Sequence, residues 1–112
     1  MLNIDADNNI YLTRGDTCIL DVDITDADGN PYTMAASDKL IFTVRRMFGK
    51  GEILISKEVS APVIELSTDD TKDLSFGEYR YDVYLYNSGT HNLDTFIARK
   101  IFEVGEEVHD FE

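Results

Sequence analysis

Several features that would identify a function directly are scarce or missing in this sequence. It contains one cysteine, Cys18, so no intrachain disulfide can form and packing has to hold the fold together. The N-terminal segment MLNIDADNNIYL has neither a basic nor an apolar region, so we expect no signal peptide. No apolar run approaches the roughly 20 residues that span a bilayer. These absences predict a chain that is synthesised and folded in a cytoplasm.

Positive charge is also scarce. The 112 residues include 10 Lys and Arg against 22 Asp and Glu, which gives a formal net charge of -12. A surface this acidic repels phosphate backbones and anionic lipid headgroups, so we expect neither a nucleic acid nor a membrane as partner. It favours solubility and remains compatible with cations or with a basic partner surface.

The chain offers no constellation of catalytic residues. The motifs G-x-S-x-G, Walker A and H-E-x-x-H are all absent. Cys18 falls on the inward face of an expected strand, whereas the histidines, His91 and His109, fall in a hairpin loop and in the acidic tail. We interpret Cys18 as a small buried hydrophobe. The sequence therefore predicts that the protein is not an enzyme and uses no cofactor.

What the sequence does contain is a short-period alternation of apolar and polar residues. Hydrophobic residues make up 43% of the chain, enough for a core, and 112 residues suit one domain. We expect one domain over residues 1–105 and an acidic tail over 106–112. The alternation predicts seven strands: Ile10–Thr13, Thr17–Ile24, Lys39–Arg46, Ile53–Val59, Val63–Leu66, Glu78–Tyr86 and Leu93–Val104. This pattern predicts an all-β, immunoglobulin-like antiparallel β-sandwich, with a small closed barrel as the alternative.

Two segments interrupt the β pattern, and each predicts a local structure of its own. In STDDTKDLSFG, Ser67 or Thr68 can cap one helical turn that carries Asp69 and Asp70 at its positive end. The alternation of the last strand slips near residues 98–100, which predicts a β-bulge.

The segment LSFGEYRYDV supports a sandwich. It places Tyr79 just after a glycine at the start of the penultimate strand, which resembles the tyrosine corner of immunoglobulin domains. Tyr81 stands where disulfide-bearing domains have a cysteine, and Cys18 stands where the other cysteine would be. Because the chain has no tryptophan, we expect Phe42 to fill the centre of the core.

The tripeptide Arg14-Gly15-Asp16 lies between the first two expected strands. Gly15 supplies the backbone freedom that a chain reversal needs, and the charges beside it are expected to be solvated. Three residues make a very weak motif, and integrin ligands are secreted proteins. We therefore predict a turn and no integrin partner.

The acidic segment DADGN offers a weak candidate for a metal site. Asp26, Asp28 and Asn30 have the spacing of the first three ligands of a Ca²⁺ loop. The positions that should hold Gly and Glu in an EF-hand hold Pro31 and Ser37 instead. We interpret Asp28-Gly29 as a tight hairpin turn and expect no bound metal.

The outward side of the strongest strand is the best candidate for a binding surface. Tyr84 and Tyr86 point away from the core face, and the strand over 39–46 is expected beside them. Tyrosines next to an aliphatic residue and an arginine are typical of protein interfaces. The alternative is ordinary cross-strand pairing on a solvated sheet. The candidate interface residues are Ile41, Thr43, Arg45, Tyr84 and Tyr86.

The order of the motifs resembles one known family. NIYLTRGDT is followed by LDVDITDADGNPY, DKLIFTVRR, TDDTKDLSFGEYRYDVYL, DTFI and FEVGEEVH. This resembles the immunoglobulin-like N-terminal domain of baseplate upper proteins and related tail-region proteins from phages and prophages of Gram-positive bacteria. In that family an R-G-D/E-[TS] turn opens the domain and G-x-Y-x-Y-D-[VI]-x-L marks the penultimate strand.

The resemblance covers nearly the whole chain and has several implications. It implies a non-enzymatic structural or docking protein of a tail or baseplate, made in the bacterial cytoplasm and carried in the virion tail if assembled. Its partners would be other phage structural proteins, and a homo-oligomer is one option. Baseplate upper proteins continue into long helical or adhesin segments, whereas this sequence ends at Glu112, so we expect a small accessory protein. The alternative function is a small carbohydrate- or calcium-binding β-sandwich module.

Overall fold

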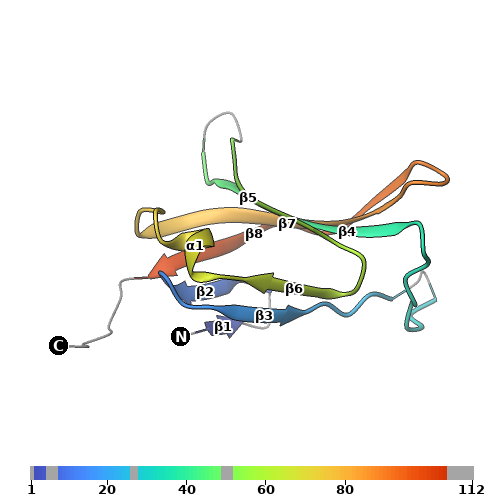
Figure 1. The fold of residues 1–112 in the computed structure, drawn as a ribbon, viewed down its shortest axis with the longest axis horizontal. Coiled ribbons are helices and arrows are strands. Elements are labelled where there is room, and N and C mark those ends of the chain that lie inside the picture. The colour runs from blue at the N-terminus through green and yellow to red at the C-terminus, as the bar shows by residue number, and fades with distance from the viewer. Residues whose placement is uncertain (1, 5–7, 26–27, 49–51, 106–112) are drawn as a thin grey trace.

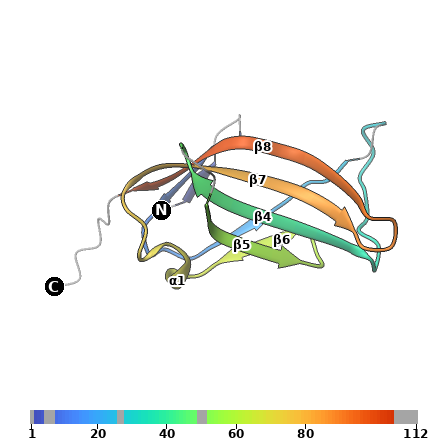
Figure 2. The same ribbon diagram turned by 90° about the horizontal axis from the view of Figure 1, so that it is seen from above.

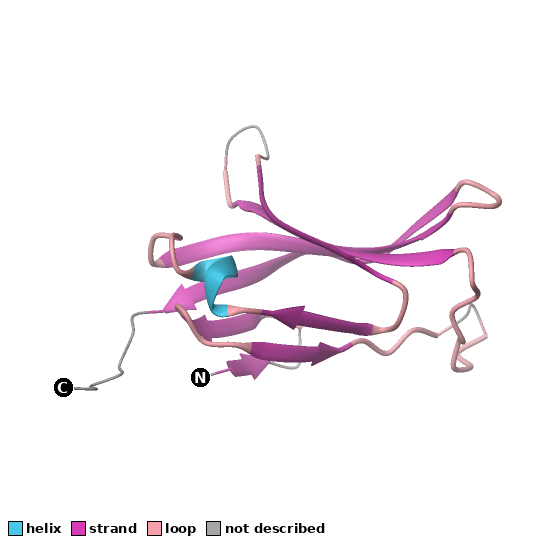
Figure 3. Ribbon diagram, viewed as in Figure 1, coloured by secondary structure: helices cyan, strands magenta, loops and turns pink. Residues whose placement is uncertain are grey.

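A computed structural model describes residues 2–4, 8–25, 28–48 and 52–105 of the chain (Figure 1). The acidic tail 106–112 and Asp26 lie outside the described residues. Strands dominate, with one helical turn near the middle of the sequence (Figure 3). The elements are β1 (Leu2–Ile4), β2 (Ile10–Thr13), β3 (Cys18–Asp21), β4 (Asp38–Arg46), β5 (Ile53–Val59), β6 (Val63–Leu66), α1 (Thr68–Thr71), β7 (Gly77–Asn87) and β8 (Asn92–Gly105).

These strands form two sheets that face each other, with the core between them (Figure 1). One sheet has the order β1-β2-β8-β7-β4-β5, and the other pairs β3 with β6. The predicted all-β sandwich is therefore confirmed, and no strand ladder joins the two sheets into a closed barrel within the described ranges. The finer immunoglobulin-like description stays a prediction.

One pairing departs from the antiparallel prediction, because β2 runs parallel to β8. After β2 the chain turns at residues 14–16 and crosses to the opposite sheet, where β3 pairs with β6. β2 therefore stays in the larger sheet, where it pairs with the last strand, β8. The side chain of Asn9 begins this pairing, since its Oδ1 accepts a hydrogen bond from the Ile101 N–H at 2.9 Å.

The alternation in the sequence correctly places the core. Leu40, Phe42 and Val44 are fully buried on the inner face of β4. The Phe42 ring lies 5.4 Å from the ring of Tyr81 and 6.2 Å from that of Phe102, so it occupies the central place predicted for it. Each large apolar side chain buried in this way stabilises the fold by roughly 1.5–3 kcal/mol.

β3 is shorter than the predicted strand over 17–24, and its partner explains why. The ladder with β6 ends where Asp21 pairs with Val63. The residue before Val63 is Pro62, which has no N–H to donate, although its carbonyl still accepts a hydrogen bond from the Val22 N–H at 2.9 Å. The strand therefore stops at Asp21, while Val22 and Ile24 stay partly buried against the core.

The two longest strands carry the bulge that the sequence predicts. The pairing of β7 with β8 shifts register on either side of Val83, between the positions opposite Lys100 and Thr95. Figure 2 shows β4, β7 and β8 side by side and reaching beyond β3 and β6 toward the β7–β8 hairpin. β1 is an eighth strand that the sequence did not reveal, because three residues are too few for alternation to register.

Candidate protein–protein interface

The surface predicted to make contacts is the side of β4 and β7 that points away from the core, here called the outer face. The pairing of these two strands sets Ile41 directly opposite Tyr84, and Arg45 directly opposite Arg80. Tyr86 lies opposite Lys39. The fold therefore places the predicted contact residues on two neighbouring strands of one sheet.

Thr43 is a correction to the predicted contact set. Its side chain is only 1% exposed, and its hydroxyl has no hydrogen-bond partner within the described part of the chain. Thr43 is short and lies among the longer outer-face side chains of β4 and β7, opposite Asp82, so its neighbours cover it. A partner cannot reach Thr43 in this conformation, whereas Ile41, Arg45, Tyr84 and Tyr86 are half-buried and remain accessible.

Tyr86 is held by the hairpin that follows it. Its hydroxyl lies 3.0 Å from Nδ1 of His91, and the two rings are 6.4 Å apart. Leu93 pairs with Tyr86 from β8 and is 57% exposed. The hydrophobic surface of the outer face thus continues from Tyr86 onto β8.

A buried carboxylate that sequence reasoning missed fixes this end of the sheet. Asp38 is 1% exposed, and it accepts hydrogen bonds from the Tyr32 hydroxyl (2.5 Å), the Ala35 N–H (2.7 Å) and Asn87 Nδ2 (2.8 Å). These bonds, that of Tyr32 foremost, hold the pKa of Asp38 below its ordinary value. No local spacing could have revealed the group, because Asp38 and Asn87 are 49 positions apart.

Asn87 extends the same network into the β7–β8 hairpin. Its Oδ1 accepts hydrogen bonds from the N–H groups of Gly89 (2.9 Å) and Thr90 (3.0 Å). The Ser88 N–H also donates to the carbonyl of Ser37 at 2.9 Å. These hydrogen bonds join the start of β4 to the end of β7 and to the hairpin that follows it.

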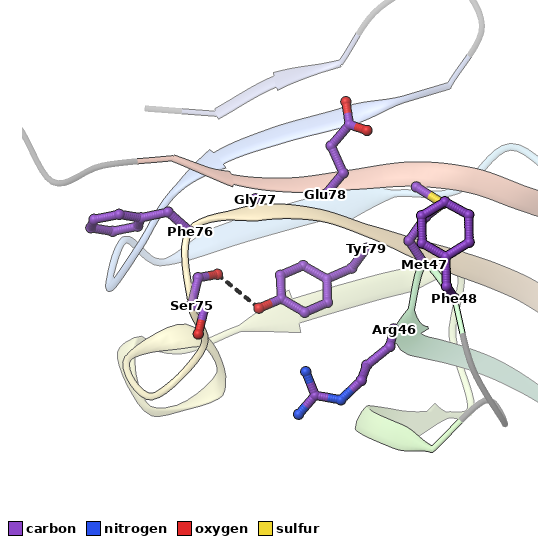
Figure 4. Close-up of a pocket in the computed structure, with 8 residues that line it drawn as sticks. All are labelled: Arg46, Met47, Phe48, Ser75, Phe76, Gly77, Glu78 and Tyr79. Carbon is purple, nitrogen blue, oxygen red and sulfur yellow. Dashed lines mark hydrogen bonds between the residues drawn. The ribbon is translucent and has the colours of Figure 1, made fainter.

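A second candidate is an open groove at the opposite end of β4 and β7, shown in Figure 4. It has a volume of about 320 Å³ and two exposed aromatic side chains, Phe48 (85% exposed) and Phe76 (49% exposed). No pattern in the sequence indicates this groove, because Met47 and Phe48 follow an expected strand without any alternation of their own. The lining residues are Arg46, Met47, Phe48, Ser75, Phe76, Gly77, Glu78 and Tyr79.

The wall of this groove contains the predicted tyrosine corner. The Tyr79 hydroxyl donates to the carbonyl of Ser75 at 2.7 Å, four residues upstream, which is the hydrogen bond that a tyrosine corner makes (Figure 4). Gly77, between them, has φ of +136°, a conformation that side-chain-bearing residues rarely adopt.

The Arg14-Gly15-Asp16 tripeptide is a turn, as predicted. The Asp16 N–H donates to the Thr13 carbonyl at 3.0 Å, and Gly15 has φ of +85°. The turn packs on the α1 region, because the Gly15 N–H donates to Thr71 Oγ1 at 2.8 Å. The Arg14 guanidinium lies 4.3 Å from the centre of the Phe76 ring, in cation–π geometry. The Arg14 side chain therefore makes a contact within the fold, whereas the sequence predicted a fully solvated charge.

The predicted helical turn also has a structural role. α1 begins after Ser67, whose N–H donates to Asp70 Oδ2 at 2.7 Å. Burial acts to raise the pKa of Asp70, but this hydrogen bond and Lys57 Nζ, 3.0 Å from Asp70 Oδ2, outweigh it and lower the pKa. The ion pair joins β5 at the edge of the large sheet to α1.

The residues considered as a nucleophile or as metal ligands lie in surroundings that indicate a structural role. Cys18 is buried, and burial raises the pKa of its thiol, which agrees with its interpretation as a small hydrophobe. Asp28 and Asn30 are exposed beside Gly29, whose φ of +84° fits the predicted turn. Within the described ranges, no group of three or more His, Cys, Asp and Glu side chains is placed to hold a metal ion.

Two further findings concern the chain as a whole. Among the described residues there is no helix of the length and apolarity needed to cross a bilayer. Comparison of this chain with protein-family models, with curated proteins and with solved structures found no match.

Proposed function

We propose that this protein is a non-enzymatic docking protein of a phage or prophage tail or baseplate, and that it acts through protein–protein contacts. The phage assignment, and with it the finer immunoglobulin-like description of the fold, is supported by the order of motifs that resembles the N-terminal domains of baseplate upper proteins. The docking role is supported by the outer face. Its partners would be other phage structural proteins or a second copy of the chain.

The observation that carries the docking role is the pairing of Ile41 with Tyr84 on a sheet surface where both side chains are half-buried and accessible. Tyrosine and arginine side chains are enriched among the few residues that contribute most of the binding energy of protein interfaces. The hydrogen bonds around Asp38 already fix the strands that carry them. Binding therefore has little backbone order to impose, which lowers its entropic cost.

Binding to the proteins encoded by neighbouring tail genes tests this proposal. Isothermal titration is carried out with the wild type, with a Tyr84→Ala/Tyr86→Ala variant and with Ile19→Ala as a matched control on the exposed side of β3. We expect the double variant to weaken binding at least roughly tenfold, and the control to leave it unchanged. Unchanged binding and self-association in the double variant would contradict the proposed surface.

The alternative is a small carbohydrate- or calcium-binding module. Accessible tyrosines on a sheet can stack on sugar rings, and Asp28 and Asn30 are exposed oxygen ligands on one turn. Titration calorimetry with Ca²⁺ and with a glycan panel distinguishes this function from docking. Saturable heats would favour the module, and flat traces would remove it.

A further inference from the structure

The groove at the end of β4 coincides with a gap in the large sheet. β4 ends at Arg46, which pairs with Tyr79, whereas β7 begins two residues earlier, at Gly77. On its other side, β7 is paired with β8 along this stretch as well. Within the described ranges, no strand therefore pairs with residues 77–78 on the side where β4 would continue.

This gap leaves backbone groups of β7 available to a further strand. Successive residues of an antiparallel strand direct their N–H and C=O groups to alternate sides, so one of Gly77 and Glu78 presents both groups to the gap. In the part of the chain that the structure describes, no backbone hydrogen bond joins either residue to another segment on that side. The space beside Gly77 is open, because a Cβ atom there would meet no described neighbour within 4 Å. Unpaired edges of this kind are templates for an extended segment of another chain.

Exposed aromatic side chains border the gap. Phe48 follows β4 and Phe76 precedes β7, and both are exposed. The groove takes lining residues from both faces of the sheet, because Glu78 and Tyr79 point to opposite sides of β7 (Figure 4). A strand directs its successive side chains to both faces, so a strand added here would contact both sets of lining residues.

The charge beside the gap is negative on the outer face. Glu78 lies directly opposite Glu103 on β8, and neither carboxylate has an ion pair among the described residues, Arg80 included. Carboxylates in directly opposite cross-strand positions repel each other, and both attract a Lys or Arg side chain. Arg46, which also lines the groove, points to the other face, where its Nε lies 3.9 Å from Oε1 of Glu52 (Figure 4). The net charge of -12 further favours a basic segment.

The edge of the large sheet at β5 is less suited to pairing with another chain. Lys57 lies in this strand two positions after the buried Ile55, so it belongs to the inner face. Its Nζ is 3.0 Å from Oδ2 of Asp70 in α1. Charged side chains that point inward on an edge strand discourage the addition of a further strand. The gap beside β7 has no such ion pair across it among the described residues.

We propose that the gap beside residues 77–78 binds an extended peptide segment of a partner protein, one with a large apolar side chain between Lys or Arg residues. The segment pairs with β7 in the antiparallel direction, as β4 does. Its apolar side chain contacts Phe48 and Phe76, and a basic side chain lies beside Glu78 and Glu103. Main-chain hydrogen bonds supply affinity in this mode of recognition, and the side-chain contacts supply specificity.

NMR titration of the ¹⁵N-labelled protein with the peptide acetyl-Lys-Val-Phe-Val-Lys-amide tests this site. We expect saturable shifts of the backbone amide signals of Gly77 and Glu78. N-methylation of the three central peptide residues removes their N–H donors and should weaken binding roughly tenfold. Glu in place of both Lys residues should weaken it at least roughly tenfold. The absence of shifts at these two amides, or equal binding of either altered peptide, would overturn the proposal.

Variants of the protein assign the contacts. Phe48→Ala should weaken peptide binding roughly tenfold and leave the melting temperature unchanged, because Phe48 is 85% exposed. Glu78→Gln should reduce the preference for the Lys peptide over the Glu peptide, and it decides alone if Phe48→Ala lowers the melting temperature. Ile19→Ala and Glu65→Gln are the matched controls, since these exposed residues lie opposite each other on the small sheet. Controls that weaken binding as much as the groove variants would contradict the site.

The outcomes separate this site from the docking surface proposed above, which it goes beyond because it includes neither Tyr84 nor Tyr86. The Tyr84→Ala/Tyr86→Ala variant should lose tail-protein binding but keep the Lys peptide. If that variant loses the peptide and Phe48→Ala does not, the segment binds the outer face and this inference is wrong, while the docking function stands. Shifts of the Gly77 amide that depend on protein concentration alone would show a second copy in the gap, and would overturn the assignment to a partner.

Discussion

The inner and outer faces of β4 differ in how well their buried atoms are packed and hydrogen-bonded. On the inner face, Leu40, Phe42 and Val44 are fully buried among apolar and aromatic neighbours. On the outer face of the same strand, the buried hydroxyl of Thr43 has no hydrogen-bond partner among the described residues, and Arg45 lies opposite Arg80 in the strand register. The inner face is therefore closely packed and apolar, whereas the outer face contains a buried polar atom that the described residues leave without a hydrogen bond. Buried polar groups without a hydrogen-bond partner are rare in folded proteins, so the two faces of one strand differ in how completely they are satisfied.

The largest expected effect comes from breaking the inner face. Phe42→Ala should lower the free energy of unfolding by about 3–5 kcal/mol, because it empties the centre of the core. Ile41→Ala, the neighbouring residue on the outer face, should lower it by about 1 kcal/mol or less. Urea unfolding followed by circular dichroism measures both. Similar losses for the two variants would show that the faces do not differ in the way described.

The next largest effect concerns the turn that carries the chain from the large sheet to the small one. Gly15→Val should destabilise the fold by about 2 kcal/mol, because φ of +85° is costly for any residue with a side chain. Asp16→Glu keeps the charge and should leave both stability and partner binding unchanged. Thermal unfolding of the two variants is the measurement. A Gly15→Val variant as stable as the wild type would mean that the turn can relax to another conformation.

A smaller effect is expected at the tyrosine corner. Tyr79→Phe keeps the ring in the core but removes the hydrogen bond to the Ser75 carbonyl, so it should cost about 1 kcal/mol. Tyr86→Phe removes a more exposed hydroxyl and should cost less. Chemical denaturation of the pair measures the difference. A larger loss at Tyr86 would indicate that the hairpin end, not the corner, stabilises β7.

The smallest effect is expected for Asp38→Asn at acid pH. The hydrogen bonds to Asp38 hold its pKa below the ordinary value of 3.8, so the unfolded state binds the proton first. The stability that the carboxylate contributes is thus present above about pH 4 and is lost as pH falls through its folded pKa. We expect the wild type to exceed the variant in melting temperature at pH 7, and the difference to shrink toward pH 3. A difference that is constant across this range would contradict the assignment.

Much of the fold could be predicted from local patterns. Alternation located seven strands and the buried residues of β4 and β7, and glycines at positions 15 and 29 marked turns that the structure confirms. Less of the candidate site could be predicted. Tyr84 and Ile41 were placed on one face, but the burial of Thr43 depends on neighbours from β7 that the alternation of β4 does not specify.

By itself, the sequence determined the period-two pattern, the turn positions, the Ser67 cap and the tyrosine corner, because each depends on residues close together along the chain. Only the tertiary structure decided the parallel pairing of β2 with β8, the bonds between Asp38 and Asn87 and the opposition of Arg45 to Arg80. These arise from strand register over tens of residues. A one-residue slip in register would turn every side chain to the other face, so they are fixed only when the whole sandwich packs.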